Sequence, residues 1–471
     1  MTGQRNVSVV FSKILLVLCC CQLSTDRNMG SSKGFETPRG VIQPLDGGET
    51  TERGSENGPT DTEKPTHEEE EFKEGGYGWV VVAAVWLILA HSFGINSMFG
   101  VFLAFYLAHD HFPGATPLQF AFVGGLSFSV AFIISPFATI LFNKVGLRVT
   151  VIIGGLFISG AYIGASFAKT IWELILSQGV CYGLGMGICY TATAGLIAKW
   201  FKKRRALANG IATGGTGFGG LTYSLAANAM IQRMGIAWTF RIMAIICFVV
   251  LITSALFLKE RNQGTKISAT AFDFKLFKLP DFWLFLGWAW LSSFGYVAVV
   301  FSLSAYAQQV GFSAQQGSLV SAMFNLSTGI GRPIVGFMGD RFGTIRVTTL
   351  GTFISALFTF FIWIFGGKSY GALMVYGLLG MFPSIMWATF AVMTASIFGL
   401  EKMQPVISLS TLTLALPYTF AEAIALSLKK PGRDGFLDVQ VYSGAMFVAA
   451  TICSLALTIK KGELYGRKKD D

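Results

Sequence analysis

One apolar segment carries a stripe of polar residues that ends in an arginine: Ser321, Asn325, Thr328 and Arg332. Successive members are three or four residues apart, so an α-helix would place them on one face. An arginine inside a membrane helix costs about 2.5–3.5 kcal/mol on insertion scales, and a guanidinium binds carboxylates through paired hydrogen bonds. We therefore predict that Arg332, Thr328 and Asn325 bind a small anionic or polar organic substrate. The alternative is a helix-end arginine that reaches the lipid headgroups.

The first apolar segment carries two more candidate substrate-binding residues, His91 and Asn96. His91 lies near the middle of the segment, where an ionisable group is costly unless it faces a cavity. A neutral, hydrogen-bonded histidine is the equal alternative. The run from His109 to His111 has metal-ligand residue types, but no third strong ligand lies nearby, so we interpret it as a solvated loop. We expect no metal and no catalytic site.

The elements that must position these residues are long and apolar. The chain is 52% hydrophobic and 13% charged, with a mean hydropathy of +0.57. Its stretches without Lys, Arg, Asp or Glu are 79–109, 111–143, 149–168, 174–198, 206–232, 242–258, 282–331, 347–367, 369–400, 403–421 and 439–459. About 20 apolar residues cross a bilayer as a helix, and 282–331 is long enough for two helices with a turn at 308–316. We predict an all-α membrane protein with twelve transmembrane helices.

A phrase near the start of each half of the apolar region is repeated. It begins at Pro136 and again at Pro333. The repeat predicts two six-helix bundles, an architecture typical of carriers that work by alternating access. Its charged turns follow a tight glycine geometry, and we predict that they gate the protein rather than only setting its topology. The candidate gating residues are Asn143, Lys144, Arg148, Asp340, Arg341 and Arg346.

Charge and composition also predict orientation and domains. Basic residues gather in the loops that are cytoplasmic if both termini are cytoplasmic, so the net charge of +10 belongs to a membrane surface and not to a nucleic-acid site. We expect a disordered acidic tail, an N-terminal bundle, a linker, a C-terminal bundle and a basic tail. Their ranges are 1–73, 74–260, 261–281, 282–460 and 461–471. Whether residues 1–28 are a genuine part of the protein is left open.

The glycines of the fifth span match a nucleotide-binding pattern, G-x-G-x-x-G, at Gly215, Gly217 and Gly220. That pattern binds a phosphate only between a strand and a helix, whereas here it lies inside a charge-free membrane segment. We therefore expect no cofactor and interpret the glycines as sites of close contact between helices.

Several motifs resemble those of a known family. Twelve spans and the duplicated loop resemble the major facilitator superfamily. More narrowly, Glu74–Trp79 resembles the monocarboxylate-transporter signature, Trp200–Gly210 resembles that family's fourth-to-fifth loop, and Gly331–Pro333 matches its substrate arginine. The acidic tail and the glycine-rich fifth span look like the fungal branch, whose members carry organic acids, riboflavin or secondary metabolites. The resemblance implies a plasma-membrane carrier.

The resemblance leaves several functions open. Secondary active or facilitated transport of an organic anion or fungal metabolite, as in an efflux carrier, is the first. Uptake of riboflavin or a monocarboxylate is a second, and a nutrient sensor that keeps the carrier fold without transport is a third. Residues alone do not separate uptake from export.

Lactate transport tests how far the resemblance extends. Ser97 and Thr328 stand where the resemblance implies a titratable lysine and aspartate. We expect negligible lactate uptake into proteoliposomes under an inward proton gradient, because a serine or threonine hydroxyl neither gains nor loses a proton at physiological pH. Strong gradient-driven accumulation that disappears without the protein would contradict this expectation.

Overall fold

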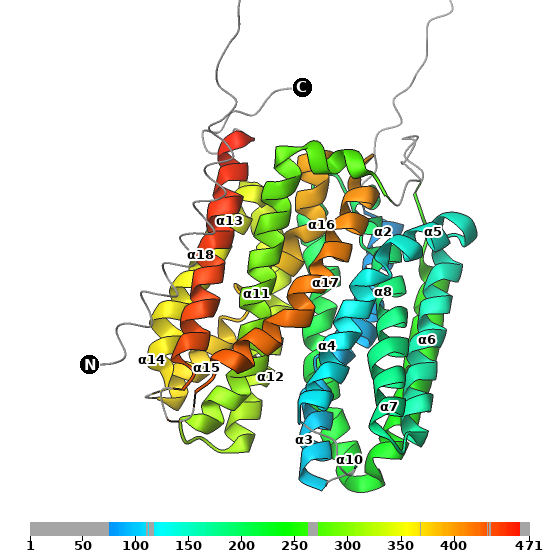
Figure 1. Ribbon diagram of the computed structural model, residues 1–471. Helices are drawn as coiled ribbons and strands as arrows, with labels where there is room; N and C mark the ends of the chain where they lie inside the picture. The colour runs from blue at the N-terminus through cyan, green and yellow to red at the C-terminus, as the bar shows by residue number, and fades with distance from the viewer. Residues whose placement is uncertain are drawn as a thin grey trace, which may run out of the picture. The chain divides into compact units, whose positions relative to one another are not determined.

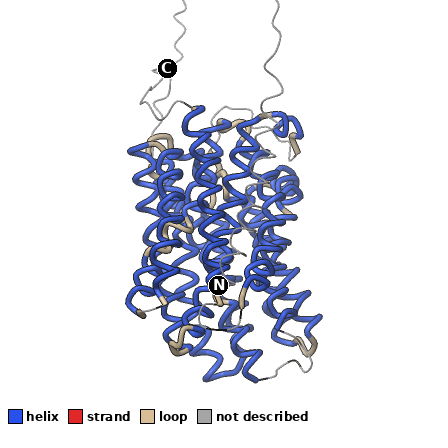
Figure 2. The backbone as a smooth tube through the Cα atoms, turned by 60° about the vertical axis from the view of Figure 1, so that its left-hand side comes forward, coloured by secondary structure: helices blue, strands red, loops and turns tan. Residues whose placement is uncertain are grey.

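The computed structural model describes residues 75–109, 112, 117–261, 272–367, 369–430, 432 and 435–461. Within these ranges the chain is helical and contains no strand (Figure 2). The expected tail 1–73, residues 262–271 of the predicted linker, and residues 462–471 lie outside the described residues, as do Asp110 and His111. We call 75–261 the first half and 272–461 the second half.

The helices of the first half form six consecutive segments (Figure 1). They are Tyr77–Leu89 (α2) with Ala90–Gly94 (η1) and Phe99–His109 (α3); Pro117–Ile133 (α4) with Ser135–Val145 (α5); Leu147–Phe167 (α6); Ile171–Leu174 (α7), Ile175–Cys181 (η2), Tyr182–Thr193 (α8) and Leu196–Trp200 (α9); and Arg205–Phe257 (α10). α10 comprises two segments because Gly235 interrupts it with a φ of 76°, a backbone conformation that glycine adopts without strain.

The second half repeats this arrangement. Its helices are Phe274–Lys278 (η3), Pro280–Gln309 (α11), Ala314–Phe342 (α12), Thr344–Phe358 (α13), Thr359–Trp363 (η4), Ile364–Gly366 (α14), Tyr370–Leu378 (α15), Ile385–Phe398 (α16), Met403–Leu428 (α17) and Leu437–Lys460 (α18). The predicted turn between the seventh and eighth spans is confirmed. Ser313 and Gln316 form a reciprocal capping box there, which satisfies two backbone donors at the start of α12.

Eight of the described helices are long and apolar enough to cross a membrane, and a ninth span counts if α4 and α5, bent by 50°, are taken together. Every predicted apolar segment is helical. The segments that fall short of this criterion are the first part of α10, α12, and the pair α15 and α16, which residues 379–384 separate. The first part of α10 and α12 are rich in glycine, serine and threonine, which lowers their mean hydropathy, and small residues bring the facing sides of these two helices into backbone contact.

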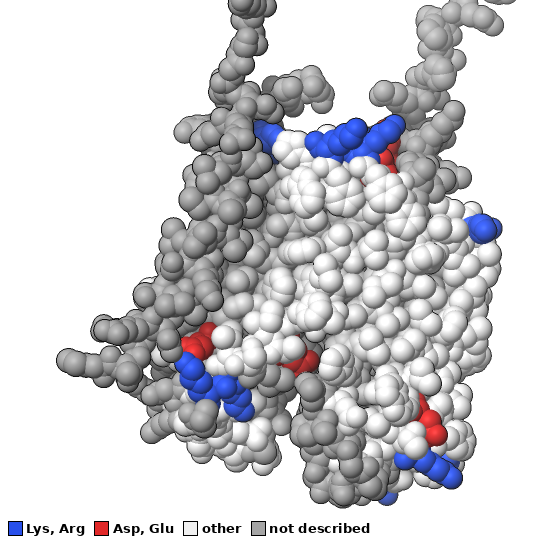
Figure 3. Space-filling view, viewed as in Figure 1, with Lys and Arg blue, Asp and Glu red and all other residues white. Residues whose placement is uncertain are grey.

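The surface separates lipid-facing and aqueous regions. In Figure 3 the side of the molecule is almost free of charged residues, which gather toward the two ends. Leu256, Phe337 and Ile459 are among the apolar side chains exposed there, as expected of helices that face hydrocarbon. We call the end that carries Gly146, Gly343 and Lys461 the linker end, and the opposite end the far end.

Glycines bring α10 into backbone contact with the first span of its own half and with α12 of the second half. This confirms the predicted close contact between helices. A Cβ at Gly214 would lie 2.8 Å from the carbonyl oxygen of Gly329, and one at Gly217 would lie 2.5 Å from that of Asn325. On another face of α10, Gly219 lies as close to the carbonyl of Ala90. The first part of α10 is therefore wedged between α2/η1 and α12 with no side chain between the backbones.

A methyl group at Gly217 tests this contact. Gly217→Ala should lower the stability of the detergent-solubilised protein by about 1–3 kcal/mol, because the added carbon overlaps backbone that cannot rotate away. Gly160→Ala is the matched control, since a Cβ there meets nothing within 4 Å. Thermal unfolding measures both variants. Equal midpoints for the two would show that the α10–α12 contact can relax.

Candidate functional site

Arg332 is buried in the middle of α12. Its side chain is 4% exposed, and its Nη1 donates to the carbonyl oxygen of Thr213 at 2.7 Å and to Oγ1 of Thr216 at 2.6 Å. Both threonines belong to α10, in the other half. The alternative of an arginine that reaches the headgroups is therefore wrong. The guanidinium is thus partly paired, and its buried Nε has no hydrogen-bond partner among the described residues.

The rest of the polar stripe lies beside Arg332. Thr328 is 3% exposed, and its Oγ1 makes no hydrogen bond in the described part of the chain. Asn325 is half-buried, and a Cβ on Gly220 would lie 3.4 Å from its Nδ2 and 3.1 Å from Cβ of Ser97. The structure thus brings Asn325 together with Ser97, the residue that stands where the family resemblance implies a lysine.

An aromatic wall, missed by the sequence analysis, surrounds Arg332. Tyr190, Tyr296 and Tyr418 are close enough to interact electrostatically with its charge. Trp387 donates from Nε1 to the hydroxyl of Tyr418 at 2.8 Å, and the ring of Phe132 stacks on Trp387 at 5.8 Å. The sequence could have indicated this wall, because tyrosine and tryptophan in the middle of a membrane span carry a polar atom that needs a partner when buried.

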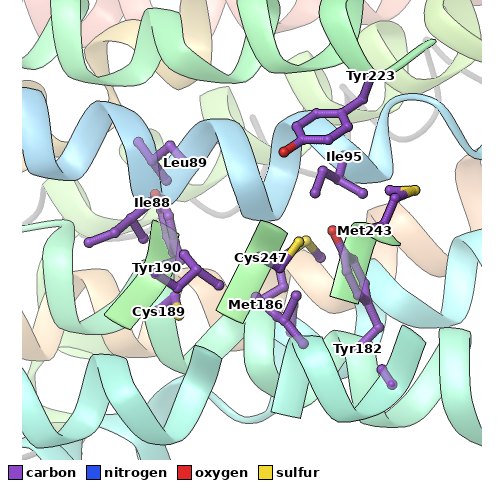
Figure 4. Close-up of a cluster of buried hydrophobic side chains, with 14 of the residues drawn as sticks. Ile88, Leu89, Ile95, Tyr182, Met186, Cys189, Tyr190, Tyr223, Met243 and Cys247 are labelled. Atoms are coloured by element: carbon purple, nitrogen blue, oxygen red, sulfur yellow. The ribbon is translucent and has the colours of Figure 1, made fainter. Parts of the chain in front are cut away.

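His91 and Asn96 do not join this group through any contact that the structure describes. Nδ1 of His91 lies 2.8 Å from the carbonyl oxygen of Leu87, and its ring meets Tyr223 edge-on at 5.5 Å. Tyr223 itself points into the core of the first half (Figure 4). The side-chain oxygen of Asn96 accepts from Ser127 at 3.1 Å. Both residues therefore hold the first half together.

The predicted gating residues differ in their contacts. Asp340 accepts from the backbone N–H of Ala206 and of Leu207, each at 2.8 Å, so α12 caps the start of α10 across the two halves. Arg148 instead donates to the carbonyl of Leu258 at 2.8 Å, within the first half. Of these two bonds, only that of Asp340 joins the halves.

The remaining gating candidates also lie at the linker end. Arg341 lies 5.5 Å from the ring centre of Phe342. Nε of Arg346 is buried without a hydrogen-bond partner among the described residues. Asn143 and Lys144 are exposed.

Other hydrogen bonds between the halves lie between the linker end and the middle. Nε2 of Gln404 donates to Thr139 and to the carbonyl of Thr191, both at 3.4 Å. Thr411 donates to Ser135 at 2.8 Å. The bond nearest the far end joins Ser129 and Thr419 at 2.6 Å. The halves are thus closed against each other at the linker end and diverge toward the far end (Figure 1).

Comparison with known proteins identifies the family. A model of the Major Facilitator Superfamily matches residues 77–422. "Probable transporter MCH2" of Saccharomyces cerevisiae is 30% identical over 409 residues, which cover 85% of this chain and 86% of that protein. The "Fujikurins efflux protein" of Gibberella fujikuroi is 25% identical and is covered to 86%, as is this chain. "Monocarboxylate transporter 10" of Danio rerio is 23% identical, covering 85% of this chain and 82% of that protein.

Two solved structures share the fold. The fucose:proton symporter FucP of E. coli superposes with a TM-score of 0.62 at 14% identity, covering 80% of this chain and 98% of that one. The human organic anion transporter MFSD10 gives 0.61 at 14% identity, covering 81% of this chain and all of that one (100%). The chain therefore belongs to the Major Facilitator Superfamily as a multi-pass membrane transporter of a small molecule, with fungal carriers and a monocarboxylate transporter among its relatives, as its motifs predict.

Proposed function

We propose that this protein moves a small organic anion across the plasma membrane by alternating access, without enzymatic activity and without a cofactor. The observation that carries the proposal is the buried guanidinium of Arg332 at the contact between the halves. A substrate bound there contacts both halves, so its access to either side of the membrane changes when the halves move relative to each other. Export of a fungal metabolite and uptake of an organic acid both remain compatible with this site.

The unpaired polar atoms of the site support the proposal that the substrate carries a carboxylate or similar anionic group. Nε of Arg332 and Oγ1 of Thr328 are buried and lack partners in the described part of the chain, and they lie one helical turn apart. A buried donor without an acceptor costs about 1–3 kcal/mol, so a carboxylate that accepts from both would recover that free energy. The aromatic wall of Trp387 and Tyr418 would contact the apolar body of the same molecule.

The distribution of charge supports a cytoplasmic linker end. Lys199, Lys202, Lys203 and Arg205 lie there, at the junction of α9 and the start of α10, and cytoplasmic loops carry an excess of basic residues. Both chain termini are then cytoplasmic. Because the halves are bonded to each other at this end, the structure corresponds on this proposal to an outward-facing state.

The cap from Asp340 to α10 acts in this proposal as the cytoplasmic latch. A carboxylate at a helix N-terminus satisfies free N–H groups and interacts favourably with the helix dipole, contributing about 0.5–2 kcal/mol. The bond crosses the two halves, so it must break when the linker end opens. It therefore stabilises the outward-facing state alone.

Replacing Asp340 with Asn tests the latch. The amide keeps one acceptor but loses the charge and the second acceptor, so the linker end should open more often. A cysteine at Ser408 reports opening in a cysteine-free background, because Ser408 is fully buried on α17 between Gln404 and Thr411. We expect Asp340→Asn to raise its labelling rate by a hydrophilic maleimide severalfold in inside-out vesicles.

The control for the latch is Arg341→Gln, which changes the neighbouring charge. Arg341 is exposed and stacks on Phe342 of its own helix, so labelling at Ser408 should remain at the parent rate. Equal labelling of the Asp340→Asn variant and its parent would rule out the latch.

Substitutions of Arg332 test the substrate site. Arg332→Lys keeps the charge but loses the planar fork, so flux should fall at least tenfold, and Arg332→Ala should abolish it. Thr328→Asp places a competing carboxylate one turn away and should raise the apparent KM for an anionic substrate. Flux is measured in proteoliposomes with the best substrate from a panel of organic acids and metabolites.

The matched control for this series is Arg233→Lys, an exposed arginine of the far end, for which unchanged flux is expected. Normal transport by Arg332→Ala at equal protein density would remove Arg332 from the substrate site.

A further inference from the structure

A single acidic side chain, Glu422, lies inside the membrane span formed by α17. It is six residues from the end of the helix at Leu428, or about 9 Å along the axis. An ionisable group at such a depth is costly unless it faces protein or water. Glu422 must therefore face either protein or water.

The exposure pattern of α17 places Glu422 toward the interior. Leu416 is 52% exposed and Phe420 is 53% exposed, which marks the face that meets lipid. Tyr418, one turn before Glu422, is 3% exposed and belongs to the aromatic wall. Residues two positions apart in an α-helix point about 200° away from each other around the axis. Glu422 therefore lies opposite Phe420, on the same face as Tyr418. Its side chain is only half-buried there.

The carboxylate of Glu422 has no protein partner among the described residues. Among the described residues, Glu260 pairs with Lys199, Asp438 with Lys430, and Asp281 with Lys460 and Lys461. No ion pair or hydrogen bond of Glu422 is found in this part of the chain. Water is the partner that the described residues leave for its charge, because the halves diverge toward the far end.

The helices packed against α17 supply no cation to replace that water. They are α4, α5, α11, α16 and α18. α4 and α16 have no ionisable side chain. The ionisable groups of the others are Lys144 on α5, Asp281, Tyr296 and Tyr306 on α11, and Asp438, Tyr442, Cys453 and Lys460 on α18. Lys144, Asp281 and Lys460 lie at the linker end, and Asp438 pairs with Lys430.

We propose that Glu422 is a proton-binding site that couples protonation to closure of the far end. Closure would strip water from an unpaired carboxylate, which is strongly unfavourable. A hydronium ion at the far end gives its proton to a carboxylate oxygen of Glu422; an O–H bond forms, and water is released. The neutral carboxyl can be buried, so the closed state carries the proton across.

This site differs in place from the titratable pair that Ser97 and Thr328 replace. It lies on α17 rather than on the first or eighth span. The inference rests on the proposed alternating access, but it does not depend on Arg332 as the substrate residue.

The test uses protons alone and no substrate. A cysteine at Ser97 reports far-end opening in a cysteine-free background, because Ser97 is exposed and borders Gly220 and Asn325 at the contact between the halves. Labelling by a hydrophilic maleimide is measured in right-side-out vesicles between about pH 4.5 and about pH 8, a range across which protein carboxyl groups titrate. Each rate is divided by that of Ser369→Cys, an exposed serine of the far end, to cancel the ionisation of the thiol.

We expect the normalised rate at Ser97→Cys to fall at least fivefold as the pH falls. Glu422→Gln mimics the neutral form and should give the low rate at every pH, and Glu422→Met should do the same. Glu422→Asp should keep the pH dependence. If the Glu422→Gln or Glu422→Met protein retains the pH dependence of the parent, another group binds the proton and the proposal fails. Because no substrate is present, a failure of the Arg332 series leaves this result unaffected.

Discussion

The backbone contact between α10 and α12 is the constraint on which the rest of the site depends. Gly210, Gly214 and Gly217 remove the side chains that would separate the helices. Only at this separation does the guanidinium of Arg332 reach the carbonyl of Thr213 and the hydroxyl of Thr216. A buried arginine in the second half therefore finds its acceptors in the first half.

The same contact also explains why the latch lies where it does. With the two helices side by side from Asn325 onward, the last turn of α12 ends beside the first turn of α10, and Asp340 meets the free N–H groups of Ala206 and Leu207. The corresponding position of the first repeat is Asn143, which carries no charge. The carboxylate that joins the two halves through α10 is therefore a feature of the second repeat.

The sequence alone was sufficient to predict where the apolar helices lie, but not which residues of different helices contact each other. Charge-free stretches predicted the long apolar helices, because lipid excludes unpaired charge, and the turn at Ser313 was predicted from its polar residues; the short helix Phe274–Lys278 was not predicted. The partners of Arg332 were not predictable, since Thr213 and Thr216 are more than one hundred residues away in sequence. Glu422 was missed because the charge-free rule ended the eleventh span at residue 421, although α17 continues to Leu428.

The π-helical segment Ala90–Gly94 has a consequence for how this chain tolerates length changes. A wider turn of this kind holds one more residue than an α-helical turn, so it behaves as an insertion absorbed without a loop. Removing one residue from it would restore regular α-helical winding with little rotation of Tyr77–Leu89, whereas the same deletion in a regular stretch would rotate that segment by about 100°. Trp86 would then keep its backbone contact with Gly215. The segment is therefore the place in the first span where the loss of one residue should disturb helix packing least.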